Sequence, residues 1–241
     1  MMPPTGEVVT LQIDGQDVSA NTEDTVLEVA RENGIFIPRL CQIDGLSVVG
    51  ACRLCLVELE GNPRLLAACV TKVAEGMRIK THSERLKQYR RRILEMLFAE
   101  GNHICSVCVS NGHCELQALG QEVGMTHSRL PWRYNRRGVD SSHDRFRLDR
   151  DRCILCTRCV RVCAEIEGAH TWDVMGRGID ASLIADLNEP WGDSETCTSC
   201  GKCVNVCPTG ALSNHGTSVG EMTKKKQFLP YLTQMRGEKH E

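Results

Sequence analysis

The chain has 241 residues, a formal net charge of −2 and 25% charged residues, so its charge does not indicate nucleic acid or an anionic membrane as the main partner. The sequence has no apolar run long enough to span a membrane, and its start lacks the basic and apolar regions of a signal peptide. We therefore expect a soluble cytoplasmic protein, and association with a membrane through partners stays open.

Fifteen cysteines dominate the composition. Thiols stay reduced in the cytoplasm, so clustered cysteines there indicate metal sites rather than disulfides. The apolar fraction of 41% includes these cysteines, and only 4% of the residues are aromatic, so the conventional core is thin. We expect bound clusters to stabilise the fold as well as to carry function, because metal-binding energy is folding energy.

The first third of the chain predicts hairpins and one helix. Residues 8–20 read as two strands around an Asp-Gly turn. Residues 25–34 predict a helix that opens with a Thr-x-x-Glu capping box and ends at a glycine. A second hairpin is expected around residues 61–63, and residues 76–81 look like a closing strand.

The first cysteine group lies in this region, at C-x10-C-x2-C-x13-C spacing: Cys41, Cys52, Cys55 and Cys69. The spacing differs from C-x4-C-x2-C of plant ferredoxins but combines the same parts, a long loop, a C-x-x-C turn and a distant fourth ligand. We interpret it as a [2Fe–2S] site. A zinc ribbon with four cysteine ligands is the alternative, because the spacing alone does not exclude it.

A helix is predicted over SERLKQYRRRILEMLFAEG, with its apolar residues on one face: Leu86, Tyr89, Ile93, Leu94 and Leu97. The same helix carries a basic run made of Arg85, Lys87, Arg90, Arg91 and Arg92. This run is either an ordinary solvated face or a docking face for an acidic partner.

Three cysteines at C-x2-C-x5-C spacing follow within GNHICSVCVSNGHCELQ: Cys105, Cys108 and Cys114. Three thiolates are one short of the four ligands that a tetrahedral zinc or an iron–sulfur cluster usually takes. The stretch also holds His103 and His113, and a short helix is predicted from CELQALGQEVG.

The strongest motif is a C-x2-C-x2-C-x3-C run that occurs twice, which is the spacing of two-cluster bacterial ferredoxins. The second run is followed by Pro208, as in that motif, and the first by Ala164. In two-cluster proteins the fourth cysteine of each run binds the other cluster. We therefore assign one [4Fe–4S] cluster to Cys153, Cys156, Cys159 and Cys207, and another to Cys163, Cys197, Cys200 and Cys203. Two zinc sites are the alternative, although zinc loops do not normally pack cysteines in this way.

Counting the cysteines then constrains the stretch that holds three of them. The first group uses four and the repeat uses eight of the fifteen, so three remain. No cysteine is left to complete their site, and the fourth ligand must be another type of residue.

The order of these motifs resembles the N-terminal part of the large iron–sulfur subunit of respiratory complex I, and it also occurs in [FeFe]-hydrogenases. The chain ends shortly after the second run, so we expect no catalytic domain. With FAEGNHICSVCVSNGHCELQ and DRDRCILCTRCVRVCAEIEGAHTWDVMGRGIDA, it resembles the HoxU-type diaphorase subunits of bidirectional NAD-reducing [NiFe]-hydrogenases. Subunits of NAD-linked formate dehydrogenases share this architecture.

The resemblance implies an α+β fold. Residues 1–81 would form a β-grasp [2Fe–2S] ferredoxin domain, and residues 82–126 a small [4Fe–4S] domain with one histidine and three cysteine ligands. A linker over 127–144 would lead to a two-[4Fe–4S], bacterial-ferredoxin-like domain over 145–215. The tail, 216–241, is partly apolar and partly basic, and is either a docking segment or a frayed end.

In the wider family the histidine ligand belongs to His-x3-Cys, where this chain has Gly101. The available residue is His103, which we expect to join Cys105, Cys108 and Cys114 on a [4Fe–4S] cluster. His113 directly precedes a cysteine ligand, and two adjacent side chains rarely reach the same iron. His113, water or a backbone group remain the alternatives.

The sequence shows no G-x-G-x-x-G motif, no P-loop and no general acid/base constellation, so we predict no catalytic residue in this chain. One [2Fe–2S] and three [4Fe–4S] clusters indicate electron transfer. By the resemblance, the chain would relay electrons between a flavin- and NAD-binding diaphorase subunit and the small and large subunits of a [NiFe]-hydrogenase, as one subunit of an NAD-reducing enzyme. A free-standing electron carrier and a zinc-binding structural module are the alternatives from other classes.

Overall fold

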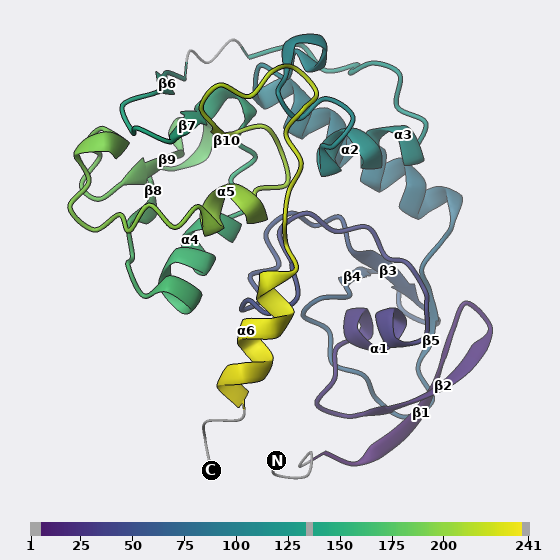
Figure 1. Ribbon diagram of the computed structural model, residues 1–241. Coiled ribbons are helices and arrows are strands. Elements are labelled where there is room, and N and C mark those ends of the chain that lie inside the picture. The colour runs from purple at the N-terminus through teal and green to yellow at the C-terminus, as the bar shows by residue number, and fades with distance from the viewer. Residues whose placement is uncertain (1–5, 134–136, 238–241) are drawn as a thin grey trace. The chain divides into compact units, whose positions relative to one another are not determined.

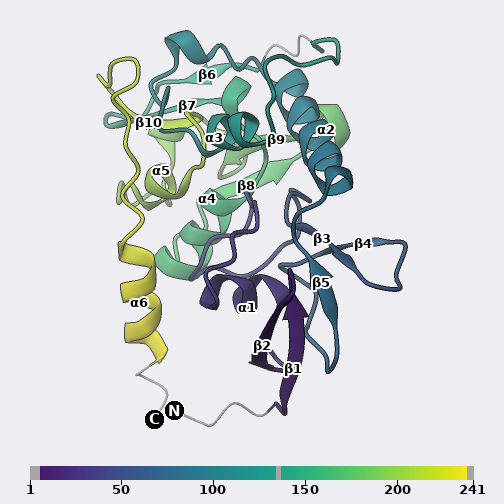
Figure 2. The same cartoon turned by 90° about the vertical axis from the view of Figure 1, so that its right-hand side faces the viewer.

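The computed structural model describes residues 6–133 and 137–237. The chain divides into two compact units. The first contains the described residues before Ile43 together with Val48–Ile93, and the second contains Ile43–Ser47 and Leu94–Arg236. Figure 1 and Figure 2 show the ribbon from two directions, and each unit is described here by itself. Both mix helices and strands, as the expected α+β class requires.

The first unit is built on one five-stranded sheet with the strand order β2-β1-β5-β3-β4. β1 is antiparallel to β2 and parallel to β5, and β3 is antiparallel to both β4 and β5. Its elements are β1 (Val8–Ile13), β2 (Gln16–Asn21), α1 (Val26–Glu32), β3 (Leu56–Leu59), β4 (Leu65–Ala67) and β5 (Arg78–Lys80).

Local sequence signals account for most of this unit. Asp14 and Gly15 have φ of +51° and +84°, as a two-residue turn between twisted strands requires. The predicted capping box is present, with Thr25 accepting from the backbone N–H of Glu28 and the Glu28 carboxylate accepting from the backbone N–H of Thr25. Gly34 follows α1 with φ of +71°. Buried apolar residues of α1 then share one core with the strands.

The predicted basic helix is α2 (Glu84–Glu100). Leu86 and Leu94 are fully buried, whereas Tyr89 is exposed. The reading of the basic run as wholly solvated is wrong for Arg90, which is only 4% exposed. Arg90 lies four residues from each of the two buried leucines, on the same face of the helix. Its guanidinium donates to three backbone carbonyls, those of Leu54 at 3.2 Å, Leu56 at 2.8 Å and Thr81 at 2.9 Å.

The second unit holds a three-stranded sheet, order β10-β7-β6, and a two-stranded sheet of β8 and β9. Its strands are β6 (Val139–Asp140), β7 (Phe146–Asp149), β8 (Trp172–Met175), β9 (Ser182–Ala185) and β10 (Leu212–Asn214). Its helices, apart from the end of α2, are α3 (Glu115–Glu122), α4 (Arg158–Arg161), α5 (Lys202–Val206) and α6 (Phe228–Gly237), and a π-helical turn, Val162–Glu167, continues α4.

The predicted repeat is visible in how these elements are arranged. β7 leads to the first cysteine run and α4, while the second run and α5 lead to β10, and β7 and β10 pair antiparallel (Figure 1). Aromatic side chains fill the middle of the unit. Trp191 is 1% exposed and stacks on Phe146 at 5.5 Å and against Trp172 at 4.7 Å between ring centroids.

Two segments differ from their predicted character. The polar stretch interpreted as a linker contains β6, and its Arg129 forms a bidentate pair with buried Glu95 at 2.9 and 3.1 Å. Residues 43–47 belong to the second unit, although they lie between Cys41 and Cys52, within the predicted N-terminal domain. Within that unit Ser47 donates to the Glu165 carboxylate and its carbonyl accepts from Arg161. No helix among the described residues is long and apolar enough to cross a membrane.

Candidate metal centres

The first cysteine group converges in the first unit. Three of its members are at most 2% exposed and Cys52 is half-buried. The backbone N–H of Cys52 donates to the sulfur of Cys41 at 3.4 Å, and the N–H of Leu40 donates to the sulfur of Cys52 at 3.4 Å. The thiol of Cys69 donates to Cys55 and lowers the pKa of Cys55 to about 7, while the hydrogen bond with Cys55 and burial raise the pKa of Cys69.

The four thiols cannot all ionise easily, because each thiolate would repel its neighbours in a poorly solvated site. The hydrogen bond with Cys41 and burial accordingly raise the pKa of Cys52. A cationic metal core removes this penalty, since thiolates are the form that binds metal. The donor set therefore fits a thiolate-bound cluster.

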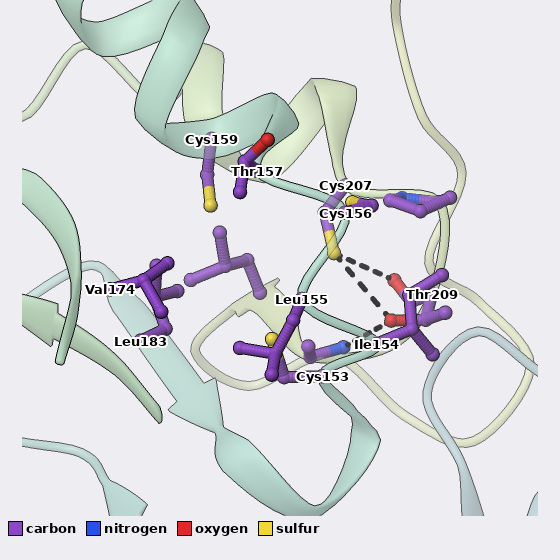
Figure 3. Close-up of a pocket in the computed structure, with 13 residues that line it drawn as sticks. Cys153, Ile154, Leu155, Cys156, Thr157, Cys159, Val174, Leu183, Cys207 and Thr209 are labelled. Atoms are coloured by element: carbon purple, nitrogen blue, oxygen red, sulfur yellow. Dashed lines mark hydrogen bonds between the residues drawn. The ribbon is translucent and has the colours of Figure 1, made fainter. Parts of the chain in front are cut away.

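The two ferredoxin runs line two separate cavities. Cys153, Cys156, Cys159 and Cys207 line the first, which Figure 3 shows. The second is lined by Cys163, Cys197, Cys200 and Cys203. The fourth cysteine of each run therefore lies with the first three of the other run, as the ferredoxin spacing predicts. Both cavities are otherwise mostly apolar, with side chains such as Leu183 and Leu212 in the first.

The backbone of the two runs repeats as closely as the spacing does. Leu155 and Thr157 have φ of +50° and +56°, and the equivalent Ser199 and Gly201 have φ of +56° and +71°. These left-handed residues bend each run around its cavity, with Thr157 and Gly201 as the N-caps of α4 and α5. Thr157 is the unusual member, since a β-branched residue rarely adopts positive φ.

In the absence of metal, burial favours the protonated form of four of these thiols. It raises the pKa of Cys153 to about 11 and that of Cys156 to about 12, and it raises the pKa values of Cys159 and Cys203 as well. Ionising four such thiols requires a positively charged core. Both cavities therefore fit a group that binds thiolates, such as an iron–sulfur cluster.

Two tryptophans contact sulfurs of the second cavity. The indole N–H of Trp191 donates to the sulfur of Cys197 at 3.3 Å, and Trp172 hydrogen-bonds Cys203 and favours its thiolate. The sequence analysis did not single out these residues. The only signal was that two of the three tryptophans in an aromatic-poor chain lie beside the ferredoxin runs.

The stretch with three cysteines forms a third site in the second unit. Cys105 begins a 3-10 turn, Cys105–Val107, and the N–H of Cys108 donates to the Cys105 carbonyl at 3.0 Å. Cys114 is the N-cap residue of α3. The charge of Cys108 acts on both Cys105 and Cys114, and burial raises the pKa of Cys114 to about 11.

His103 lies near one of these three cysteines. It lines one open pocket with Cys105, and its Nε2 is buried without a hydrogen-bond partner. The other ring nitrogen donates to the carbonyl of Leu97, which fixes the tautomer that leaves Nε2 as an acceptor. Burial lowers the pKa of His103 to about 4, so the ring is neutral and able to bind metal at neutral pH. His113 is exposed.

The glycine at the family's histidine position has a structural reason. A Cβ on Gly101 would lie 2.3 Å from the carbonyl oxygen of Asp151 and 2.8 Å from Nε2 of His103. No side chain fits there, and the space next to Gly101 is filled by the ring of His103.

Other buried polar atoms lie inside the cysteine loops. The hydroxyl of Ser110, between Cys108 and Cys114, and that of Thr157, between Cys156 and Cys159, are buried without a hydrogen-bond partner. Buried polar groups normally have partners, so such atoms indicate a missing ion or cofactor. Together with Nε2 of His103 they support clusters in these loops.

Among the described residues, no three His, Cys, Asp or Glu side chains converge closely enough to hold a single metal ion.

Comparison with known protein families divides the chain into three matched regions. Residues 6–84 match a 2Fe-2S iron-sulfur cluster binding domain, and residues 90–129 match the NADH-ubiquinone oxidoreductase-G iron-sulfur binding region. Residues 144–213 match the ferredoxin-like domain of NADH-quinone oxidoreductase subunit 3. These matches confirm the predicted fold class, and they confirm both a [2Fe–2S] cluster and [4Fe–4S] clusters as cofactors.

Individual relatives agree with this division. The gamma subunit of the NAD-reducing hydrogenase HoxS from Cupriavidus necator is 34% identical over 205 residues, which cover 85% of this chain and 86% of that subunit. The alpha subunit of the NADPH-Fe(3+) oxidoreductase from Geobacter sulfurreducens is 39% identical over 212 residues, 85% of this chain but only 24% of that protein. This chain thus spans about a quarter of that longer relative.

A solved structure is similar over nearly the whole chain. It is a chain in the crystal structure of an NAD+-reducing [NiFe]-hydrogenase in the H2-reduced state, with a TM-score of 0.82 and 38% identity. The similarity covers 87% of this chain and 88% of that chain.

Proposed function

Because this chain belongs to the family of iron–sulfur subunits of NAD-reducing hydrogenases, whose domains are shared with complex I, we propose that it transfers electrons within such an enzyme complex. The chain itself supplies no residue for hydride or hydrogen chemistry. Its task is to hold redox groups at fixed positions between partners that perform that chemistry.

We propose four clusters, whose potentials the protein sets through ligand type, hydrogen bonds and exposure. The [2Fe–2S] cluster is assigned to Cys41, Cys52, Cys55 and Cys69. The three [4Fe–4S] clusters are assigned to His103, Cys105, Cys108 and Cys114; to Cys153, Cys156, Cys159 and Cys207; and to Cys163, Cys197, Cys200 and Cys203. When bound, each cluster accepts and releases one electron at a time.

The observation that carries the proposal is the exchange of the fourth cysteine between the two ferredoxin runs. Cys207 lies in the cavity of the first run, and Cys163 lies in the cavity of the second. Such an exchange serves two adjacent clusters in one domain. Adjacent clusters are useful for passing electrons and have no evident use in a site that only stabilises a fold.

The proposed partners follow from the relatives. One would be a flavin- and NAD-binding diaphorase subunit, and the others would be the small and large subunits of a [NiFe]-hydrogenase. The domain boundaries 1–81, 82–126, 127–144 and 145–215, with the tail 216–241, are proposed as the working division of the chain. A cytoplasmic location is also proposed, on the sequence features described above.

Metal analysis of the complex purified from its native host tests this function. We expect the iron and acid-labile sulfide of one two-iron and three four-iron clusters, with nickel in a co-purifying subunit. Stoichiometric zinc without sulfide would overturn the cluster assignment. Molybdenum or tungsten in place of nickel would identify a formate dehydrogenase, and a chain that purifies alone with its clusters would indicate a free-standing carrier.

A further inference from the structure

The segment after β10 returns to the cysteine sites of the second unit. Figure 1 shows this segment as the yellow coil that leaves β10 and leads to α6. The N–H of Gly220 donates to the carbonyl of Cys108 at 3.1 Å, and the N–H of Met222 donates to the carbonyl of Val109 at 2.9 Å. The side chain of Met222 is buried in the core of the unit. This segment is therefore ordered along the third cysteine site.

Lys224 extends from this segment towards the ferredoxin runs. Its ammonium donates to the carbonyl of Val204 at 2.9 Å and to the carbonyl of Leu212 at 2.6 Å. Val204 lies in α5, directly after Cys203, and Leu212 lies in β10. Two carbonyls on separate elements thus fix the position of one positive charge.

The surroundings of this charge are cysteines of all three proposed [4Fe–4S] sites. Burial is the largest influence on Lys224 and lowers its pKa, while the charges of Cys207, Cys114, Cys203 and Cys108, in that order, act against burial and favour the protonated form. Cys207 belongs to the first ferredoxin cavity, Cys203 to the second, and Cys108 and Cys114 to the third site.

A second lysine, Lys226, also holds the segment against the third cysteine site. Lys226 pairs with the carboxylate of Glu115, the residue after Cys114. The same carboxylate receives a bidentate pair from buried Arg158 at 2.9 Å for each contact. The intervening Lys225 has an exposed side chain, and only its backbone N–H is used, donating to Asn205 at 3.0 Å.

We propose that Lys224 is a redox-tuning residue, whose fixed positive charge raises the reduction potentials of the [4Fe–4S] clusters around it. The inference rests on the proposed function, because it needs those clusters in their assigned sites. An oxidised [4Fe–4S] core is positively charged, but together with four thiolate ligands it forms an anionic complex, and reduction adds one more negative charge. A nearby cation stabilises the reduced form more than the oxidised form.

The alternative is that Lys224 only satisfies two carbonyls. The carbonyl of Val204 lies in the last turn of α5, where backbone acceptors lack partners within the helix. Lys224→Gln separates the two roles, because an amide donates hydrogen bonds but carries no charge. Lys224→Arg retains the charge, and Lys225→Gln removes the same charge from the exposed neighbour.

The test is an EPR-monitored redox titration of the intact complex carrying each variant, together with its iron content. For Lys224→Gln we expect the reduced-to-oxidised ratio of at least one [4Fe–4S] signal to fall about tenfold at fixed potential, which is about 59 mV for a one-electron couple. The [2Fe–2S] signal serves as the internal reference, because the inference concerns only the [4Fe–4S] clusters. Lys224→Arg and Lys225→Gln should titrate like the wild type.

Identical titrations of Lys224→Gln and Lys225→Gln would overturn the inference and leave the proposed function intact. Absence of [4Fe–4S] signals from the wild-type complex would instead overturn the proposed function. If Lys224→Gln loses its clusters, the iron content of Lys224→Arg shows whether the positive charge of residue 224 is required. Recovered clusters in Lys224→Arg support a requirement for the charge, and equal loss contradicts it.

Discussion

The indole N–H of Trp191 donates a hydrogen bond to the sulfur of Cys197 at 3.3 Å. Trp191 is almost fully buried, and its ring contacts Trp172, which in turn hydrogen-bonds Cys203. Two sulfurs of one proposed cluster site thus receive hydrogen bonds from a pair of touching tryptophans. Hydrogen bonds to cluster sulfurs raise the reduction potential, because they stabilise the more negative, reduced state.

Trp191→Phe should therefore lower the potential of the cluster assigned to Cys163, Cys197, Cys200 and Cys203. One hydrogen bond contributes about 1 kcal/mol, which corresponds to a shift on the order of 40 mV for a one-electron couple. EPR-monitored redox titration measures the shift. Trp132→Phe, at a half-exposed position, is the control, and an unchanged potential in Trp191→Phe would refute the role of the hydrogen bond.

His103→Ala should remove the cluster assigned to Cys105, Cys108 and Cys114 and spare the others, because it deletes the buried nitrogen that has no other partner. His103→Cys should retain the cluster at a lower potential, since a thiolate adds a negative charge that neutral imidazole lacks. EPR spectra and iron content per chain report both results.

His113→Ala provides the matched control for the histidine assignment. His113 is exposed, so its removal should change neither iron content nor spectra. An intact cluster signal in His103→Ala, or its loss in His113→Ala, would show that the assignment of the fourth ligand is wrong.

Arg90→Met should destabilise the first unit by about 3 kcal/mol. The substitution leaves the buried carbonyls of Leu54, Leu56 and Thr81 without their donor, and each unsatisfied buried acceptor costs on the order of 1 kcal/mol or more. Arg92→Met, on an exposed part of the same helix, should change stability by less than about 0.5 kcal/mol. Thermal unfolding followed by circular dichroism compares the two, and equal midpoints would contradict the prediction.

Thr157→Gly should stabilise the second unit by about 1 kcal/mol, because glycine adopts the φ of +56° without the strain of a β-branched residue. Gly201→Ala, at the equivalent position of the other run, should do the reverse. Its Cβ would lie 3.1 Å from the ring of Phe146 at a φ of +71°. Thr157→Gly should raise the thermal midpoint and slow the release of iron to a chelator. Gly201→Ala should lower the midpoint and speed iron release.

The sequence predicted those features that depend on neighbours along the chain. The turn at Asp14 and Gly15, the capping box of Thr25 and the cysteine spacings are local, and their geometry follows from a few residues. The burial of Arg90 was not predictable in this way, because it depends on carbonyls 9 to 36 residues away. From the sequence, Arg90 was one of five basic residues close together, and such a run normally predicts a solvated helix face.

The candidate sites show the same division. Spacing predicted the grouping of the cysteines of the ferredoxin runs, but the hydrogen bond from Trp191 to Cys197 and that from Lys224 to the carbonyl of Val204 arise only from the tertiary fold. For the fourth ligand of the third site, the sequence already favoured His103, because His113 directly precedes Cys114. The burial of His103 and its unpartnered Nε2 support the same residue, whereas His113 is exposed.

The exchange of the fourth cysteine also bears on how the protein is made. During synthesis a chain that has emerged only as far as Glu195 would hold Cys153, Cys156, Cys159 and Cys163 but no complete ligand set of the two ferredoxin sites proposed here. The site of the first run stays one thiolate short until Cys207 leaves the ribosome. Assembly of the first of these clusters is therefore tied to synthesis of the segment that holds Cys207, and a chain terminated before Cys207 would be unable to retain that cluster.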